Sequence, residues 1–251
     1  MPRKSKPTEA SEERSLPAVA AMKFWSRFKH PPPMLAFAFP ESPGCEDELR
    51  DILTRLPAPV IDNSVVYSLK ISLDGSKSRV WRRVLTEAVS LEVLHHIIQL
   101  TMGWYDSHLH GFEVRKARVP LVEDGAAIDE RGISIAQLYD AKIKRIHYTY
   151  DFGDDWRHTV VIEKSSSQIG VPSPQCVDGQ GTCPLEDIGG MERWTQLLEA
   201  FRHPERERNE AIDDLVDRLN EGDIPPPFDL EETNARLQVA FNKPARRKGQ
   251  A

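Results

Sequence analysis

The pattern of hydrophobic and polar residues becomes regular at Val65 and predicts a sheet from that point on. From Val65 to Leu73, apolar residues occupy every second position, which is typical of a strand with one buried face. Asp74-Gly75 follows, and this pair favours a hairpin turn because glycine accepts positive φ, so residues 79–85 should return as the antiparallel partner. The same reasoning predicts a second hairpin, with strands over 146–150 and 157–163.

Helices are predicted between and after these hairpins. Ser90 suits the N-cap of a helix that Gly103 ends, and we expect this helix to pack across the sheet. A strand over 108–114 and a short helix near residue 135 follow it. The sequence therefore predicts an α+β domain of antiparallel β-hairpins with a central helix.

The last third of the chain is expected to be helical. Asp229 and Glu232 have the spacing of a capping box for the final helix. Ser, Pro, Gly and Gln residues predict a loop over residues 165–181. Residues 1–60 are expected to be a flexible proline-rich arm with one short helix, residues 61–242 the α+β domain, and residues 243–251 a basic tail.

Composition narrows the protein class. The 251 residues are 39% hydrophobic, which is enough for one sizeable core. A net charge of −6 argues against a surface that binds nucleic acid through bulk positive charge. Three cysteines do not form a closed disulfide framework, so a cytoplasmic protein is expected. The apolar run Leu16 to Met22 is far shorter than the ~20 residues of a spanning helix, so no membrane association is expected. The oligomeric state is not indicated.

Several residues suit a metal site. His108 and His110 lie two apart in a predicted strand, so their side chains should share a face, as two ligands of one ion would. The alternative is that the histidines are hydrogen-bonded structural residues and the cysteines small buried ones. The candidate metal ligands are His108, His110, Asp154, His158, Cys176 and Cys183.

The tract from Asp151 to Asp155 places three carboxylates on a tight turn, where they suit magnesium or the activation of a water molecule. Turns also recruit Asp and Gly for conformational reasons alone. Trp156 and His158 follow this turn directly, which keeps a functional interpretation open beside the structural one. No cofactor is fixed by the sequence, and a divalent metal, zinc or magnesium, is the one that these donors suit.

Two further pairs are candidate binding residues. Glu186 and Asp187 precede Gly189-Gly190 and a predicted helix, so they either approach a ligand or cap that helix. Arg82 and Arg83 are neighbours in a strand and must point to opposite faces, so only one of them can face a site.

These motifs together resemble the Ri-plasmid ORF-three-like family, which includes passenger proteins of insertion elements. The resemblance implies an α+β domain reminiscent of the β-grasp and a plasmid or mobile-element origin. The resolvase label of some relatives finds no support, since the sequence shows no recombinase nucleophile with its arginine cluster. The family's characteristic positions correspond here to Trp81, Arg82, Arg83, Gln99, Trp104, His108, His110, Asp151, Gly153, Asp154, Trp156, His158, Cys183, Pro184, Glu186, Asp187, Gly189 and Gly190.

Two functions are compatible with this sequence. The first is a non-enzymatic binding module for a protein or nucleic-acid partner, anchored by an exposed face that carries Trp156. The second is a metal-dependent hydrolase or nuclease that uses the clustered Asp, His, Glu and Cys residues. If the separated motifs serve one site, the turn at 151–155 and the loop at 183–190 must converge with His108 or His110.

Overall fold

The computed structural model describes eight stretches of the chain, all within the second of its two units, residues 39–251. The predicted basic tail and most of the predicted arm lie outside them. Asp51, Ile52, Thr54 and Arg55 are described and are helical. The described residues are 51–52, 54–55, 65–77, 79–115, 117–120, 129–167, 174–219 and 224–241.

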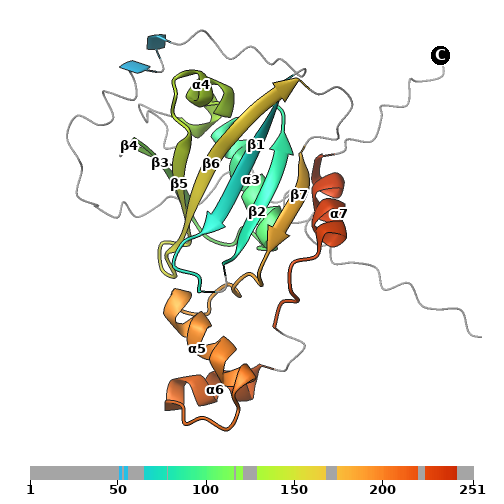
Figure 1. Ribbon diagram of the computed structural model, residues 1–251. Helices are drawn as coiled ribbons and strands as arrows, with labels where there is room; N and C mark the ends of the chain where they lie inside the picture. The colour runs from blue at the N-terminus through green and yellow to red at the C-terminus, as the bar shows by residue number, and fades with distance from the viewer. Residues whose placement is uncertain are drawn as a thin grey trace, which may run out of the picture. The chain divides into compact units, whose positions relative to one another are not determined.

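A seven-stranded sheet forms the centre of the described structure, and all its pairings are antiparallel (Figure 1). The strand order is β4-β3-β5-β6-β1-β2-β7. The predicted α+β class is confirmed. The strands are β1 (Val65–Leu73), β2 (Trp81–Thr86), β3 (His110–Val114), β4 (Ala117–Pro120), β5 (Arg145–Tyr150), β6 (Trp156–Ser167) and β7 (Gln175–Gln180).

Both predicted hairpins are present. β1 pairs with β2 across the turn that Asp74-Gly75 begins, and β5 pairs with β6 across the turn at 151–155. The long central pairing of β1 with β6 joins the two hairpins, and its register shifts once, between Ser68 and Leu69.

Helix α3 (Leu91–Met102) crosses one face of the sheet, as predicted (Figure 1). Ser90 caps it, since its side chain accepts a hydrogen bond from the Val93 N–H, and Gly103 ends it at a φ of 85°. Its apolar side Leu91, Leu94, Ile97 and Ile98 is fully buried and forms the core with the inward residues of the strands.

The remaining helices lie at the periphery of the sheet. A 3-10 turn η1 (Glu130–Gly132) and α4 (Ile135–Asp140) precede β5. Figure 1 shows α5 (Gly190–Arg202) and α6 (Glu210–Arg218) beyond one end of the strands and α7 (Leu230–Phe241) beside β7. The predicted C-terminal helices are confirmed. Asp229 accepts a hydrogen bond from the Glu232 N–H, which is half of the predicted capping box.

The predicted loop over 165–181 is wrong at both ends. β6 continues to Ser167, and Gln175–Gln180 forms the edge strand β7. An edge strand pairs on one side only and buries few side chains, so its sequence lacks the apolar alternation that predicts strands. Asn234 of α7 holds β7 from outside, because its side-chain amide bonds both the N–H and the carbonyl of Cys176 at 2.9 and 2.8 Å.

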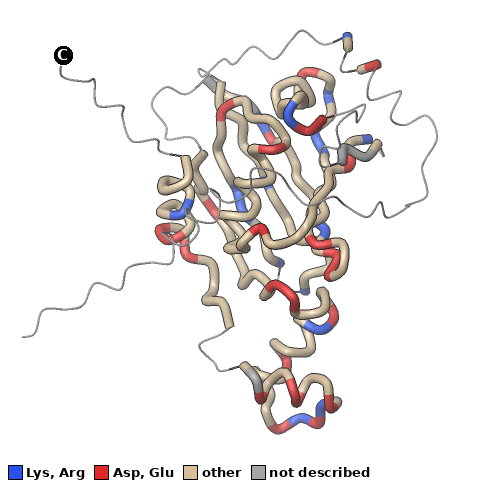
Figure 2. The backbone as a smooth tube through the Cα atoms, turned by 180° about the vertical axis from the view of Figure 1, so that it is seen from behind, with Lys and Arg blue, Asp and Glu red and all other residues tan. Residues whose placement is uncertain are grey.

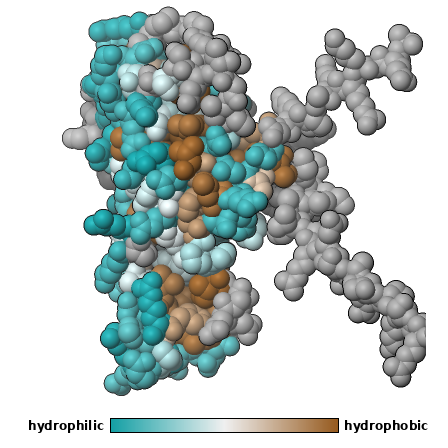
Figure 3. Space-filling model, turned by 45° about the vertical axis from the view of Figure 1, so that its right-hand side comes forward, coloured by the Kyte–Doolittle hydropathy of each residue, from teal (hydrophilic) through white to brown (hydrophobic). Residues whose placement is uncertain are grey.

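The surface is of mixed character. Acidic and basic residues are interspersed along the described part of the chain (Figure 2). Hydrophobic residues reach the surface around α5 and α6 among hydrophilic ones (Figure 3). Of the described helices, none is long and apolar enough to cross a membrane.

Candidate metal centre

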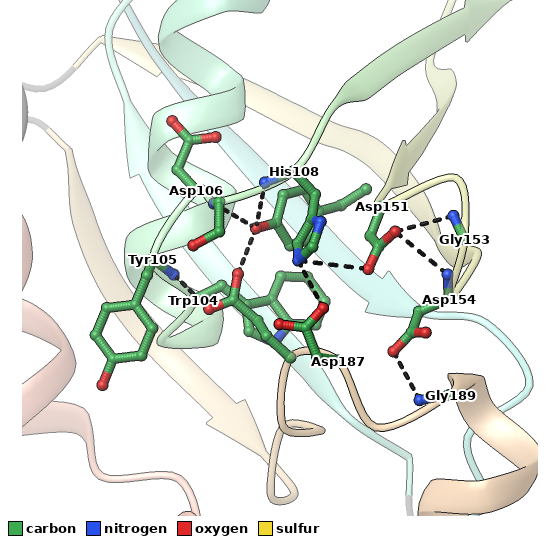
Figure 4. A network of polar contacts seen from close by, with 12 residues as sticks. Trp104, Tyr105, Asp106, His108, Asp151, Gly153, Asp154, Asp187 and Gly189 are labelled. Carbon is green, nitrogen blue, oxygen red and sulfur yellow. Dashed lines mark hydrogen bonds and ion pairs between the residues drawn. The ribbon is translucent and has the colours of Figure 1, made fainter. Parts of the chain in front are cut away.

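Three donor atoms from three separate segments meet at one end of the sheet. His108 Nε2 lies 3.1 Å from Asp187 Oδ1 and 3.7 Å from Asp151 Oδ2 (Figure 4). The three donor atoms lie within 4.8 Å of one another, and we call these residues the His108 cluster. All three were candidate binding residues in the sequence, and the turn at 151–155 and the loop at 183–190 reach His108 through Asp151 and Asp187. In the described residues, the other expected centres of convergence do not belong to this donor group: Asp154, Trp156, His158 and Glu186.

The turn after β5 aims one oxygen of Asp151 at His108. Asp151 Oδ1 accepts hydrogen bonds from the N–H groups of Gly153 and Asp154 at 2.9 and 3.3 Å (Figure 4). This is the turn geometry that aspartate favours, and Asp151 has a positive φ of 54° there. Because Oδ1 is engaged by the backbone, Oδ2 is the oxygen that faces the imidazole.

Asp154 ties this turn to the loop that carries Asp187. Its Oδ2 accepts a hydrogen bond from the Gly189 N–H at 3.0 Å (Figure 4). A Cβ atom on Gly190 would lie only 3.0 Å from the Asp154 carbonyl oxygen, so glycine permits the close approach of the two backbones. Asp154 therefore supports the cluster and belongs to no group of three donors in the described residues.

The segment that carries His108 is held by side chains from elsewhere in the fold. The N–H groups of Ser107 and His108 donate to the Tyr150 hydroxyl at 2.9 and 3.3 Å, and this hydroxyl also donates to Glu186. Glu186 in turn accepts a hydrogen bond from the Tyr105 N–H at 3.1 Å. Glu186 thus positions loop 104–108 and does not belong to the His108 cluster.

A closed ring of buried hydrogen bonds lies behind loop 104–108. Gln99 Nε2 bonds Tyr148 Oη at 3.0 Å, Tyr148 Oη bonds His95 Nδ1 at 2.8 Å, His95 Nε2 lies 2.9 Å from Asp106 Oδ1, and the Asp106 N–H donates to Gln99 Oε1 at 3.1 Å. We call these four residues the buried ring. Burial lowers the pKa of His95 to about 4, against the opposing hydrogen bond to Asp106, so its imidazole is neutral.

The hydrogen-bond directions in the buried ring follow from that neutral imidazole. A carboxylate only accepts, so His95 Nε2 carries the proton and Nδ1 accepts from the Tyr148 hydroxyl. The hydroxyl then accepts from the Gln99 amide, whose oxygen accepts from the Asp106 N–H. Each of the four hydrogen bonds in the buried ring therefore has one direction, and every donor that takes part in the ring has an acceptor.

His110 occupies a different place from His108. Strand β3 begins at His110, so strand alternation does not extend back to His108, and the expected shared face is not present. His110 is buried, stacks on His95 with 3.5 Å between ring centroids and 6° between planes, and lies 3.1 Å from Glu130. A metal lies close to the plane of each ligating imidazole, and two stacked planes cannot both contain it, so this geometry disfavours an ion shared by His95 and His110.

Trp156 and His158 are fully buried and face the core, so Trp156 is not the exposed anchor that the sequence predicted. Both belong to β6, where residues 156, 158, 160 and 162 all point inward. His158 Nδ1 lies 3.0 Å from the Trp156 carbonyl oxygen, and burial lowers the pKa of His158 to about 3.

Cys176 and Cys183 are free thiols, and burial raises the pKa of both. In the described residues neither belongs to a group of three donors that could hold an ion. Cys183 Sγ lies 3.1 Å from Arg82 Nη2 and 3.3 Å from Met102 Sδ. Arg82 is buried, whereas Arg83 points to the other face and bonds Glu163, so neither contacts the His108 cluster.

The residues that support the cluster were mostly not identified from sequence. His95, Asp106, Tyr148 and Tyr150 are polar groups inside or beside the core, and only a fold that brings α3, β5 and loop 104–108 together reveals their partners. One signal was present, because Gln99 and Trp104 are among the family's characteristic positions. Trp104 Nε1 donates to the Pro184 carbonyl at 2.9 Å and so joins loop 104–108 to the Asp187 loop.

The chain is similar to one protein family, to a protein of Sinorhizobium and to a solved structure. The family model described as plasmid pRiA4b ORF-3-like protein matches residues 65–236, which include the His108 cluster and the buried ring. The uncharacterized protein y4hQ of Sinorhizobium fredii is 35% identical over 149 residues, which are 57% of this chain and 77% of that protein. The crystal structure of a protein of unknown function from Methanosarcina mazei Go1 has a TM-score of 0.59 and 31% identity, and the match covers 67% of this chain and 97% of that one. The chain belongs to the plasmid pRiA4b ORF-3-like protein family.

Proposed function

We propose that the protein is a metal-dependent hydrolase in which His108, Asp151 and Asp187 bind a divalent cation. The observation that carries this proposal is the convergence of their donor atoms within 4.8 Å from three separate segments. His108 Nε2 is buried and faces two carboxylates without a hydrogen bond of normal geometry to either. A buried imidazole nitrogen between two carboxylates, with no hydrogen-bond partner among the described residues, suits a shared cation.

The donor set and its exposure favour a catalytic site over a structural one. One imidazole and two carboxylates suit manganese, zinc or magnesium. Structural zinc sites are closed by four protein ligands, whereas this cluster offers three and is open on the side of Asp187, whose side chain is 75% exposed. A divalent cation here would act as a Lewis acid toward a carbonyl or phosphoryl group of a substrate.

We expect purified protein to bind Mn²⁺ or Zn²⁺ at one site, and His108→Ala to weaken this binding by more than about 100-fold. The expected loss is large because a change in a supporting contact alone costs about 10–100-fold in metal affinity. Isothermal titration calorimetry with each metal measures it. His147→Ala, an exposed histidine of β5, is the matched control and should bind as the wild type does. Equal affinity in His108→Ala and wild type would exclude the site.

Hydrolysis is tested separately, with bis(4-nitrophenyl) phosphate and with single- and double-stranded DNA in the presence of Mn²⁺, Zn²⁺ or Mg²⁺. Metal-dependent turnover that disappears in Asp151→Asn and persists in His147→Ala supports the proposal. Metal binding without turnover of any of these phosphoesters would argue against a hydrolase that acts on phosphoryl groups.

A cytoplasmic location and a mobile-element origin belong to the same proposal, since the described cysteines are free thiols and the family is named after a plasmid.

A binding module remains the second candidate, and a different residue from Trp156 favours it. Tyr105 is 71% exposed while its backbone N–H is fixed to Glu186, so an exposed aromatic ring projects beside the site from a fixed backbone (Figure 4). Aromatic residues of this kind are common interface anchors and stack on unpaired bases.

For this second candidate we expect Tyr105→Ala to weaken a complex with single-stranded DNA by about 10-fold or more, which gel-shift titration measures. Val239→Ala, which removes an exposed apolar side chain of α7, is the control. Retention of full affinity by Tyr105→Ala would remove the reason for this candidate.

A further inference from the structure

Loop 104–108 is fixed to its surroundings at every residue. The Trp104 indole bonds the Pro184 carbonyl, and the N–H groups of Tyr105, Asp106, Ser107 and His108 all donate to side chains of other elements. In this segment Asp106 has a special place, because its carboxylate bonds His95 while its N–H bonds Gln99. Both partners belong to α3, so Asp106 joins the loop to the central helix.

We propose, on the basis of the metal site proposed above, that Asp106 and His95 are positioning residues that set His108 against Asp151 and Asp187. Neither contacts the ion. They act through the loop backbone, since Asp106 is two residues from His108 and lies at a positive φ of 56°. A non-glycine residue in that conformation persists only where its surroundings fix it, and here the two bonds to α3 do so.

The directions of the hydrogen bonds in the buried ring explain why Asp106 contributes more to the position of loop 104–108 than an ordinary buried contact does. Without the carboxylate, the proton on His95 Nε2 has no acceptor, and the buried imidazole is left with an unsatisfied donor. Either His95 or the loop must then move. Supporting contacts of this kind orient metal ligands, and their loss costs about 10–100-fold in metal affinity.

The test compares Asp106→Ala with Asp106→Asn in the full-length protein. Asparagine keeps an acceptor for His95 and tolerates positive φ, whereas alanine does neither. We expect Asp106→Ala to weaken Mn²⁺ binding by about 10–100-fold and Asp106→Asn to restore most of it. Tyr148→Phe, which breaks the ring on its other side, should give an intermediate loss.

A second measurement does not depend on the metal. In the metal-free protein, hydrogen exchange of the amides of Tyr105, Ser107 and His108 should accelerate in Asp106→Ala and return toward the wild-type rate in Asp106→Asn. Leu237→Ala, which removes a buried side chain from α7, controls for general destabilisation and should leave these three amides protected relative to its own global stability.

The outcomes separate the two proposals. Wild-type metal binding with Asp106→Ala binding equally well, or unchanged exchange of the three amides, would overturn the positioning role while the metal site stands. Accelerated exchange in Asp106→Ala without metal binding by the wild type would overturn the metal site and, with it, the role of the ring in holding a ligand. Loss of affinity in Leu237→Ala equal to that in Asp106→Ala would reduce the ring to general stability and also overturn the inference.

Discussion

We expect the protein to lose stability steeply as the pH falls from 6.5 toward 4, because two buried histidines stay neutral in the folded state. Burial lowers the pKa of His158 to about 3 and that of His95 to about 4, whereas an unfolded histidine has a pKa of about 6.5. Between pH 6.5 and 4 the unfolded chain therefore binds protons that the folded chain does not bind, so lowering the pH in this range favours unfolding. Above pH 6.5 the stabilising contribution is complete.

The expected loss of stability is large relative to the unfolding free energy of an ordinary domain. One pKa unit corresponds to about 1.4 kcal/mol, which gives upper limits of about 3 kcal/mol for His95 and about 5 kcal/mol for His158. A typical domain has an unfolding free energy of about 5–15 kcal/mol, so these two groups alone would remove much of it. Carboxylates add to acid unfolding only below about pH 4.5. The loss of stability between pH 6.5 and 5 is therefore caused by the histidines.

Urea unfolding at a series of pH values between 7 and 5 measures this effect. Two protons bound only on unfolding give a slope near pH 5.5 of about 2.5 kcal/mol per pH unit. His158→Asn keeps a donor near the Trp156 carbonyl without titrating, and it should reduce the slope by about half. His203→Ala changes a more exposed histidine and should leave the slope unchanged. A flat unfolding free energy over this range would show that both buried imidazoles titrate normally.

The fold was predictable where local pattern and tertiary environment agree. Strand β1 has one apolar residue at every second position and lies in the middle of the sheet, and α3 has a serine cap, an apolar side and a terminal glycine. Strand β7 has the sequence Gln-Cys-Val-Asp-Gly-Gln and owes its conformation to β2 on one side and Asn234 on the other. Partners that lie distant along the chain leave no local pattern, so this strand was missed.

The candidate site divides in the same way. Turns can be recognised from their Asp and Gly content, so Asp151, Asp154 and Asp187 could be identified as candidate site residues from the sequence. Three other candidates lie in the core because their strands turn them inward. Trp156 and His158 occupy inward positions of β6, and His110 occupies an inward position of β3. Spacing alone gives a shared face but does not say which face is buried. The buried ring required α3 and β5 to be placed against each other, and no short motif encodes that contact.

Arg82 was predicted as a binding residue, and the structure gives it a role in stability. Its guanidinium is buried and donates to the carbonyl oxygens of Thr101, Trp81, Gln180 and Gly181. It also lies 3.1 Å from Cys183 Sγ and 4.5 Å from the centroid of the Phe228 ring. One side chain therefore joins the end of α3, strand β2 and the chain that leaves β7 toward the Asp187 loop.

We expect Arg82→Ala to lower the free energy of unfolding by about 3–5 kcal/mol, because several buried carbonyl oxygens lose a charged donor and a cavity remains. Arg82→Lys should recover little of this, since an ammonium carries its three donors on one nitrogen and cannot reach the separate carbonyl oxygens that the three guanidinium nitrogens bond. Equilibrium urea unfolding and the melting temperature measure both variants.

The neighbouring arginine supplies a matched control. Arg83 follows Arg82 in β2 but points to the other face of the sheet, where its side chain is 31% exposed and bonds Glu163. Partly exposed ion pairs contribute about 0–1 kcal/mol, so Arg83→Ala should change stability by no more than that. Equal losses in Arg82→Ala and Arg83→Ala would contradict the structural role of Arg82. A stable Arg82→Ala protein that had lost metal or DNA binding would instead return Arg82 to the functional role that its sequence motif predicted.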